Sequence, residues 1–135
     1  MPAPLFDTSV WLRHLTNDNS LMSPRATALV RRIEVGDVSV RLTDQVVFET
    51  GFTLERWYKA TKAEVSDLLL PFIQLPSVIL PGKDRWGPTF DLYASSKLSL
   101  VDAFHVIEMQ DLGITEIISF DTDFDAIPGI TRTEP

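Results

Sequence analysis

Hydrophobic residues occur along the chain in short runs, and longer stretches with a helical period separate these runs. The short runs are rich in Val, Ile, Leu and Phe and are bounded by turn-forming residues, which is typical of β-strands. They predict five strands, at residues 3–6, 38–42, 76–80, 114–120 and 130–133. The run at 114–120 is the clearest, and we expect it to be a buried strand.

The stretches between these runs carry helix start and stop signals. A Ser or Thr stands before several of them as an N-cap, with Thr8 or Ser9 in this place for the first, and Gly stands after two. Six helices are predicted, at about residues 9–15, 23–34, 44–59, 62–74, 88–97 and 100–111. Because strands and helices alternate, we expect an α/β fold with three α/β/α layers, in which helices cover a mostly parallel central sheet of four to five strands.

The composition fits one globular domain. The chain has 135 residues, of which 44% are hydrophobic and 23% charged, so we treat residues 1–135 as one domain. It has no cysteine and two histidines, which excludes disulfide scaffolds, thiolate zinc sites and cysteine nucleophiles. The N-terminus lacks a secretory signal pattern and no apolar run is long enough to cross a bilayer, so we expect a cytoplasmic protein without membrane contact.

The negative charge of the chain is concentrated in its last quarter. Residues 1–99 hold equal numbers of acidic and basic side chains, so residues 100–135 account for the whole net charge of −7. A solvated acidic tail is one explanation. However, the same segment contains apolar runs that should pack, and acidic groups in a packed segment need partners, for which a divalent cation is a good candidate.

Four acidic residues occupy positions that could together form a ligand-binding site at the edge of the predicted sheet. Asp7 and Asp121 each come directly after an apolar strand run, and ligands of open parallel sheets bind outside the carboxyl ends of the strands. Asp102 lies in the first turn of the helix that leads into the second of these strands. On a helical wheel, Glu49 lies in a narrow polar strip beside the apolar stripe of its helix, to which Trp57 also belongs.

Each of the four also has a simpler local explanation. Three of them can cap a helix or open a turn, and Glu49 can pair with Arg56 or bond Thr53 on its own helix. If the four instead converge on one cleft, their carboxylates repel each other unless a metal ion or protons neutralise them. Oxygen ligands favour hard cations, so convergence predicts a Mg²⁺ or Mn²⁺ site.

Four motifs carry a resemblance to a known family. They are, in chain order, FDTSVWLRHLTND, TDQVVFETGFTLERWYKAT, LSLVDAFHVIEMQDLG and IISFDTDFDAIPGI. The chain resembles the PIN domain family over essentially its whole length, and within it the VapC-type toxin ribonucleases of toxin–antitoxin pairs. The acidic site of that family matches Asp7, Glu49, Asp102 and Asp121. Ser9 stands where many members have asparagine.

The resemblance implies a single PIN-like nuclease domain that acts as a magnesium-dependent endoribonuclease, with Mn²⁺ as a substitute metal, and as the toxin of a toxin–antitoxin pair. Asp7 and Asp102 would be direct metal ligands, and Asp121 would complete the site directly or through water. Glu49 would position or deprotonate the attacking water. The implied partners are an RNA substrate and a small cognate antitoxin, in a homodimer or a toxin–antitoxin hetero-oligomer.

Two other functions stay open at this point, a metal-dependent phosphoesterase of small substrates and a catalytically inactive PIN-like protein-binding module. Among the secondary candidates, His105 is expected to pack or to contact a second subunit, and Arg13 to form a surface ion pair. Asp123 could extend the metal shell. We expect a hydrophobic segment of the antitoxin to pack around Trp11 and Trp57.

Overall fold

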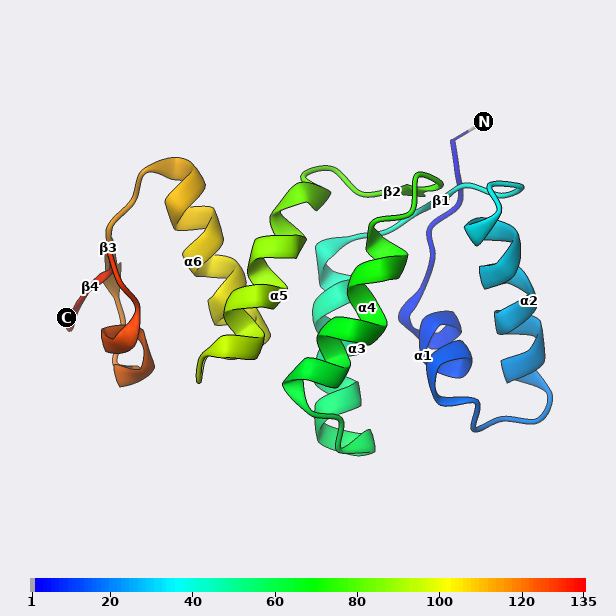
Figure 1. Cartoon of the computed structure of the whole chain (residues 1–135), viewed down its shortest axis with the longest axis horizontal. Coiled ribbons are helices and arrows are strands. Elements are labelled where there is room, and N and C mark those ends of the chain that lie inside the picture. Colours follow the sequence, from blue (N-terminus) through cyan, green and yellow to red (C-terminus); the bar gives the residue numbers. More distant parts are fainter. Residues whose placement is uncertain (1) are drawn as a thin grey trace. The chain divides into compact units, whose positions relative to one another are not determined.

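The computed structural model describes residues 2–135 and divides the chain into two compact units, Met1–Lys83 and Asp84–Pro135. Figure 1 labels the helices and strands along the chain. Each unit has its own secondary structure and its own buried aromatic residues, and the two are described in turn.

The described part of the first unit, residues 2–83, contains four α-helices and two short strands. In chain order these are α1 (Thr8–Thr16), α2 (Met22–Glu34), β1 (Val40–Arg41), α3 (Asp44–Tyr58), α4 (Lys62–Ile73) and β2 (Val78–Ile79). β1 and β2 pair in parallel, with Val40 opposite Val78. The sequence predictions for these elements agree with the structure to within a few residues at each end.

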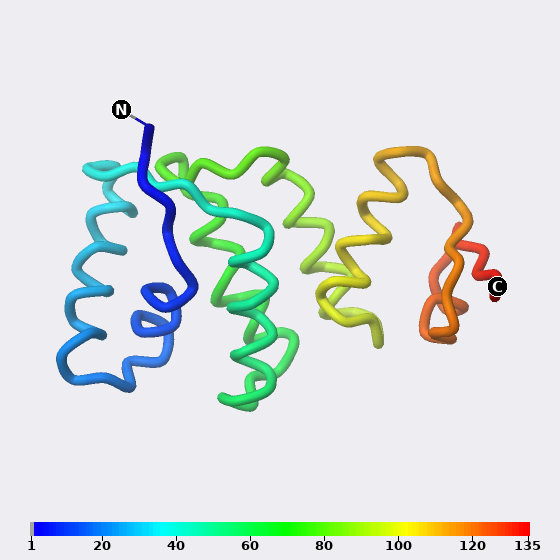
Figure 2. Tube along the Cα trace, turned by 180° about the vertical axis from the view of Figure 1, so that it is seen from behind, coloured from blue at the N-terminus to red at the C-terminus, as the bar shows by residue number. Residues whose placement is uncertain are grey.

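The predicted first strand, residues 3–6, is present as a single parallel bridge between Leu5 and Arg41. The Arg41 N–H donates to the carbonyl of Pro4 and the Phe6 N–H donates to the carbonyl of Arg41, each at 2.8 Å. In Figure 2 the dark-blue N-terminal segment runs beside the cyan segment that contains Arg41. The ladder is short because Pro2 and Pro4 have no N–H to donate.

Local capping explains where the helices of this unit begin. The hydroxyl of Thr43 accepts a hydrogen bond from the Val46 N–H at the start of α3. Thr61 and Glu64 form a complete capping box at the start of α4, in which each side chain accepts from the other residue's main-chain N–H. These bonds satisfy N–H groups that have no partner inside a helix.

A cluster of three aromatic rings fixes the segment that leads into α1. The Phe72 ring lies 5.0 Å from both the Phe6 and the Trp11 rings, and the Phe6 and Trp11 rings are 6.3 Å apart. Trp11 is completely buried, and Phe6 and Phe72 are nearly so. Because Phe6 directly precedes Asp7, this packing sets the position at which the chain enters α1.

The second unit is built on α5 (Trp86–Ser95) and α6 (Leu100–Leu112), which follow the short helix η1 (Lys83–Arg85). The ring of Trp86 lies 5.4 Å from Phe90 and 5.0 Å from Phe104, so aromatic side chains join the two helices. The strands β3 (Glu116–Ile118) and β4 (Thr131–Thr133) pair in parallel on either side of the short helix η2 (Thr122–Ala126).

The prediction that residues 114–120 form a buried strand is wrong about burial. The strand is present, but Ile118 and Phe120 expose 71% and 73% of their surface. β3 is three residues long, and among residues 2–135 it pairs with β4 alone. A hydrophobic run indicates a strand, but burial also needs other elements to cover both faces of that strand.

The predicted α/β class and the parallel strand pairing are confirmed. The strands form two two-stranded parallel sheets, β1–β2 and β3–β4, one in each unit, where the sequence predicted one central sheet of four to five strands. Among residues 2–135, no helix is both long and apolar enough to span a bilayer.

Candidate active site

Asp7 stands at the entrance to α1 and is the N-cap of that helix, which confirms the local role considered for it from the sequence; Thr8 and Ser9, the other candidate caps, lie inside the helix. Oδ2 of Asp7 accepts hydrogen bonds from the main-chain N–H of Ser9 at 3.2 Å and from the Ser9 hydroxyl at 2.6 Å. Both bonds lower the pKa of the Asp7 carboxyl below its usual value, and the bond from the Ser9 hydroxyl has the larger effect. Asp7 is therefore an exposed anion at neutral pH, which is the form that binds a metal ion.

Glu49 lies on the exposed face of α3. Its carboxylate neither pairs with Arg56 nor accepts a hydrogen bond from Thr53, the two local roles considered from the sequence. The hydroxyl of Thr53 donates to the main-chain carbonyl of Glu49 at 2.8 Å, not to the carboxylate. The guanidinium of Arg56 instead lies over aromatic rings. Within residues 2–135, the Glu49 carboxylate has no hydrogen-bond or ion-pair partner, so it is available to a ligand.

A polar cluster at Asp18 connects the end of α1 to the end of α3. Asp7 caps the first of these helices and Glu49 lies on the second. Asp18 accepts hydrogen bonds from Arg13 at 2.6 Å, from Tyr58 at 2.7 Å and from Thr16 at 2.8 Å. The hydrogen bonds from Tyr58 and Thr16 lower the pKa of the Asp18 carboxyl, and the bond from Tyr58 has the larger effect. The expected surface ion pair of Arg13 is confirmed, with Asp18 as its partner.

We expect Asp18→Asn to lower the melting temperature at pH 7 by a few degrees. The pKa of Asp18 is lower in the folded chain than in the unfolded chain, where it is about 3.9. Its contribution to stability is therefore present above the unfolded pKa and is lost as pH falls through the folded pKa. Melting curves from pH 7 to pH 2 should show the wild-type and variant temperatures converging in acid. In a Tyr58→Phe background the same substitution should have a smaller effect, and a gap that persists at pH 2 would contradict the role of the Asp18 charge.

In the second unit, Asp102 lies in the first turn of α6 and Asp121 directly precedes η2. The Ser99 hydroxyl accepts from the Asp102 N–H at 3.1 Å, so Ser99 is the N-cap of α6. The Asp102 carboxylate lies 3.8 Å from Nδ1 of His105. The Asp121 side chain accepts from the Asp123 N–H at 2.9 Å, so the turn-opening role considered for Asp121 is present.

The remaining acids near Asp121 differ in their partners. Asp125 forms a two-point contact with Arg132, with Nε–Oδ1 at 2.9 Å and Nη2–Oδ2 at 3.2 Å. Arg132 also donates to Glu134 and lowers the pKa of Asp125. The Asp125 carboxylate is therefore already paired with Arg132. Within residues 2–135, no ion pair involves Asp123.

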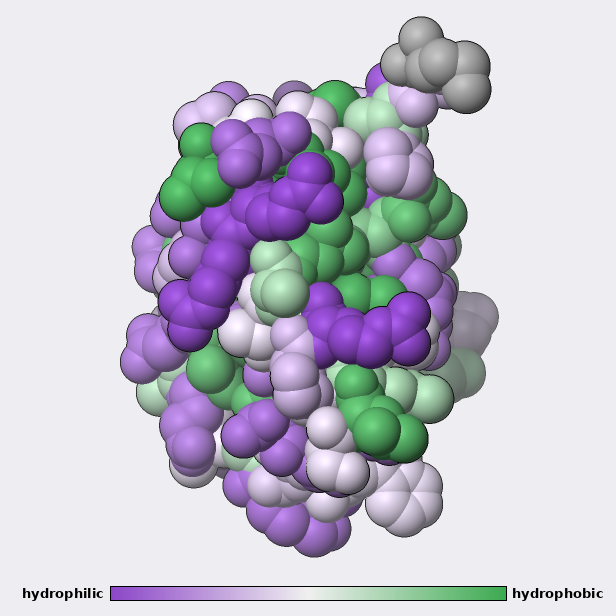
Figure 3. Space-filling model, turned by 90° about the vertical axis from the view of Figure 1, so that its right-hand side faces the viewer, coloured by the Kyte–Doolittle hydropathy of each residue, from purple (hydrophilic) through white to green (hydrophobic). Residues whose placement is uncertain are grey.

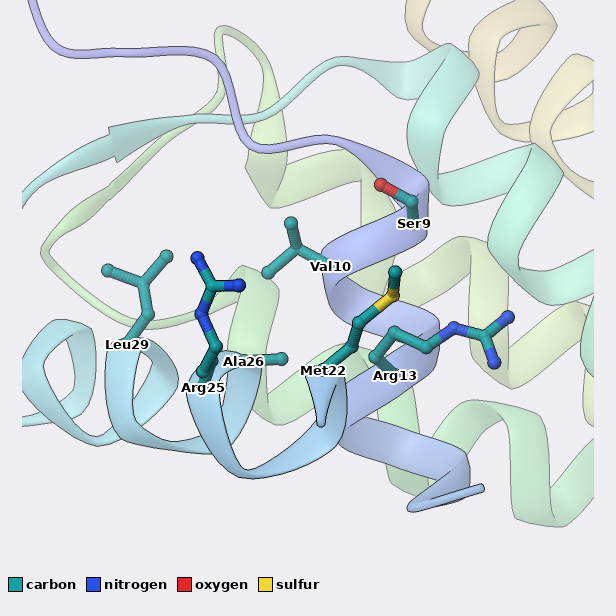
Figure 4. Close-up of a pocket in the computed structure, with 7 residues that line it drawn as sticks. All are labelled: Ser9, Val10, Arg13, Met22, Arg25, Ala26 and Leu29. Carbon is teal, nitrogen blue, oxygen red and sulfur yellow. The ribbon is translucent and has the colours of Figure 1, made fainter. Parts of the chain in front are cut away.

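A pocket of about 400 Å³ opens beside Asp7, between α1 and α2. Its lining residues are Ser9, Val10, Arg13, Met22, Arg25, Ala26 and Leu29. In Figure 4 the Leu29 and Arg25 side chains rise from α2, and Arg25 stands between Leu29 and the Val10 side chain, which projects from α1. Figure 3 shows a face of the molecule on which hydrophilic side chains border hydrophobic patches. The guanidinium of Arg25 is exposed and has no partner within residues 2–135.

Sequence reasoning did not find this pocket, because it depends on how two helices pack. The helical wheel was also wrong about Trp57, which is 70% exposed although it belongs to the predicted core stripe. A helical wheel gives the direction in which a side chain points. It does not show whether a neighbouring element extends far enough along the helix to cover that side chain. Trp11 is wholly buried, so it cannot form part of the predicted docking surface.

The side chains are compatible with a hard divalent cation. All four candidates are carboxylates, and oxygen ligands select ions such as Mg²⁺. Asp7 and Glu49 belong to the first unit, and Asp102 and Asp121 to the second. Within residues 2–135 of either unit, no three or more His, Asp or Glu side chains are grouped closely enough to hold a metal ion.

Comparison with known proteins identifies the family. The PIN domain model matches residues 5–130, a range that contains all four carboxylates and crosses both structural units. No curated protein sequence matches the chain. PIN domains are generally metal-dependent nucleases that act on RNA or DNA. Since the match covers almost the entire sequence, the chain belongs to the PIN domain family.

Proposed function

We propose that the chain is a magnesium-dependent endoribonuclease and the toxin of a toxin–antitoxin pair. The family match supports a metal-dependent nuclease. The observation that carries the proposal further is the state of two motif carboxylates in the first unit. Asp7 is held anionic by Ser9, and Glu49 is exposed without a partner among residues 2–135. Both carboxylates occupy family motif positions and neither is taken up by an ion pair within residues 2–135, so both are available to a metal ion.

The proposed site consists of Asp7, Glu49, Asp102 and Asp121. A Mg²⁺ ion held there would supply the Lewis-acid charge that phosphodiester hydrolysis needs. In the proposal Asp7 and Asp102 hold the ion directly, and Asp121 does so directly or through water. Ser9 keeps the Asp7 carboxylate oriented and deprotonated. Glu49 orients the attacking water and accepts its proton.

Affinity for RNA must come from basic side chains around the site, because the site itself is acidic. Arg25 suits this role because its guanidinium has no partner within residues 2–135 and it lines the pocket that Ser9 also lines. We propose that Arg25 contacts a phosphate of the RNA near the cleaved bond. The net charge of −7 keeps non-specific nucleic-acid binding weak.

Purified chain incubated with RNA should cleave it only with a divalent metal present. EDTA should abolish cleavage, and added Mg²⁺ or Mn²⁺ should restore it, because the carboxylates alone cannot offset the charge of the transition state. The measurement is gel analysis of a labelled RNA, with nitrophenyl phosphate assayed in parallel. Undiminished cleavage in EDTA would refute the mechanism. Turnover of nitrophenyl phosphate alone would identify a small-substrate phosphoesterase, and metal binding without any turnover an inactive binding module.

The toxin proposal requires an antitoxin that covers the acidic site. The side chain best suited to block it is an arginine or lysine, because a guanidinium matches the geometry of carboxylates and competes with Mg²⁺. We propose that such a residue approaches Asp7, Glu49, Asp102 and Asp121, on a toxin dimer or in a toxin–antitoxin hetero-oligomer.

A further inference from the structure

The last two turns of α3 carry an exposed aromatic surface beside an exposed arginine. Phe52 and Trp57 expose 58% and 70% of their surface. The guanidinium carbon of Arg56 lies 5.9 Å from the centre of the Phe52 ring and 5.7 Å from that of the Trp57 ring. Both distances are within the range of a cation–π contact. We call Phe52, Arg56 and Trp57 the α3 platform.

The α3 platform shares a helix with Glu49. Phe52 and Arg56 follow Glu49 by three and seven residues, which places them on the same face of an α-helix. Arg56 is about 10 Å from Glu49 along the helix axis. Nucleotides close to the cleaved bond would therefore pass this surface if Glu49 acts at that bond.

The charges around the α3 platform favour an anionic ligand. Within residues 2–135, Arg56 has no carboxylate partner, and its guanidinium contacts only the two rings. The exposed side chain of Lys59 bonds the Arg56 carbonyl through Nζ at 2.9 Å, which adds a second cation at this end of the helix. A purely apolar protein segment that covered the rings would leave the guanidinium buried and unpaired, at a large cost in free energy.

Single-stranded RNA satisfies both features of this surface. Bases stack on exposed aromatic rings whatever their sequence, and a phosphate pairs with an arginine that lies beside the ring. We infer that the α3 platform binds unpaired nucleotides of the substrate next to the cleaved bond, with bases on Phe52 and Trp57 and a phosphate on Arg56. The inference rests on the proposed function, since it takes RNA as the substrate.

Trp57 itself reports on the test. Of the three tryptophans, Trp11 and Trp86 are completely buried and Trp57 is 70% exposed, so iodide should quench Trp57 selectively. The full chain carrying Asp7→Asn is titrated with hexauridylate, which allows binding to be measured without cleavage. Hexauridylate should quench the Trp57 fluorescence and protect it from iodide.

Three variants in this background separate stacking, charge and nonspecific effects. Trp57→Ala should weaken hexauridylate binding, followed by anisotropy of a labelled oligonucleotide, by about tenfold to a hundredfold, because one stacked base is lost. Trp57→Phe should retain most of the affinity while losing the fluorescence signal. Arg56→Gln should lower the slope of log affinity against log salt by about 0.7, the value for one phosphate on a single strand. Leu21→Ala is the matched control, because Leu21 is an apolar residue outside α3 that is 79% exposed, against 70% for Trp57.

The outcomes distinguish this inference from the proposed function. If the wild-type chain cleaves RNA and Trp57→Ala binds hexauridylate as tightly as its parent, the α3 platform is refuted and the nuclease remains. If the chain neither cleaves nor binds RNA, the proposed function fails. If a co-purified protein partner protects Trp57 from iodide and hexauridylate does not, the surface is a protein-docking site and the inference is overturned.

Discussion

Asp7→Asn and Asp102→Asn should each lower the rate of RNA cleavage at least about a hundredfold, because each removes a charged oxygen ligand of the proposed metal site. Asn is as good an N-cap as Asp, so Asp7→Asn keeps the bond from the Ser9 N–H at the start of α1. Asn keeps the cap but not the charge that Ser9 stabilises. Asp7→Asn should therefore lose little stability, far too little to explain a loss of rate of about a hundredfold. The measurements are single-turnover cleavage at saturating Mg²⁺ and a melting curve for each variant.

Controls exist on the same parts of the chain. Asp37→Asn neutralises an exposed acid of the first unit, and Asp111→Asn neutralises an exposed acid at the other end of α6 from Asp102. Both should cleave RNA at close to the wild-type rate. Asp7→Ala should also lose activity, but it should cost about 1 kcal/mol of stability because the cap is removed. Full activity in Asp7→Asn would show that Asp7 is only a cap.

Expression of the wild-type chain alone should stop bacterial growth, while expression of Asp7→Asn should not. An unregulated endoribonuclease degrades RNA that the cell needs, and the substitution removes the proposed metal ligand while preserving the helix cap. Co-expression of the proposed antitoxin should restore growth of cells that make the wild-type chain. The measurement is colony formation on inducing medium, with protein levels compared by immunoblot.

The growth experiment also has an outcome that contradicts the toxin proposal. If the wild-type chain accumulates in folded form, without a partner, and the cells still form colonies normally, the chain is not a toxin. Such a result would leave the metal-dependent cleavage of RNA to be decided by the assay in vitro, since a nuclease with a narrow RNA preference need not stop growth.

Much of the secondary structure could be predicted because it depends on neighbouring residues. Thr43, Thr61 and Ser99 begin helices in the structure as expected, and each does so through a bond to an N–H three residues away. Gly113 ends α6 with a positive φ of 70°, a conformation that suits glycine. For the first helix, Asp7, Thr8 and Ser9 are all suitable caps, so the sequence left three candidates and the structure selects Asp7.

The candidate carboxylates were selected from the sequence by two independent routes, their positions at strand ends and helix faces and the family motifs. The structure adds what each carboxylate does locally. Asp7 and Asp121 accept main-chain hydrogen bonds, whereas within residues 2–135 the Glu49 carboxylate has no partner. The sequence could not separate these cases, because several acceptors compete for each donor within a turn and only the folded geometry selects one.

The sequence by itself determined the family, the α/β class, the helix starts and the four acidic motif positions, since these depend on residue identity and on spacings of a few residues. The tertiary structure decided which side chains are exposed and which charges are paired. Trp11 is buried and Trp57 is exposed, although both lie at helical positions that suit a core. Arg13 pairs with Asp18 while Arg56 lies over two rings. Such outcomes depend on contacts between segments far apart in the chain, which local periodicity does not specify.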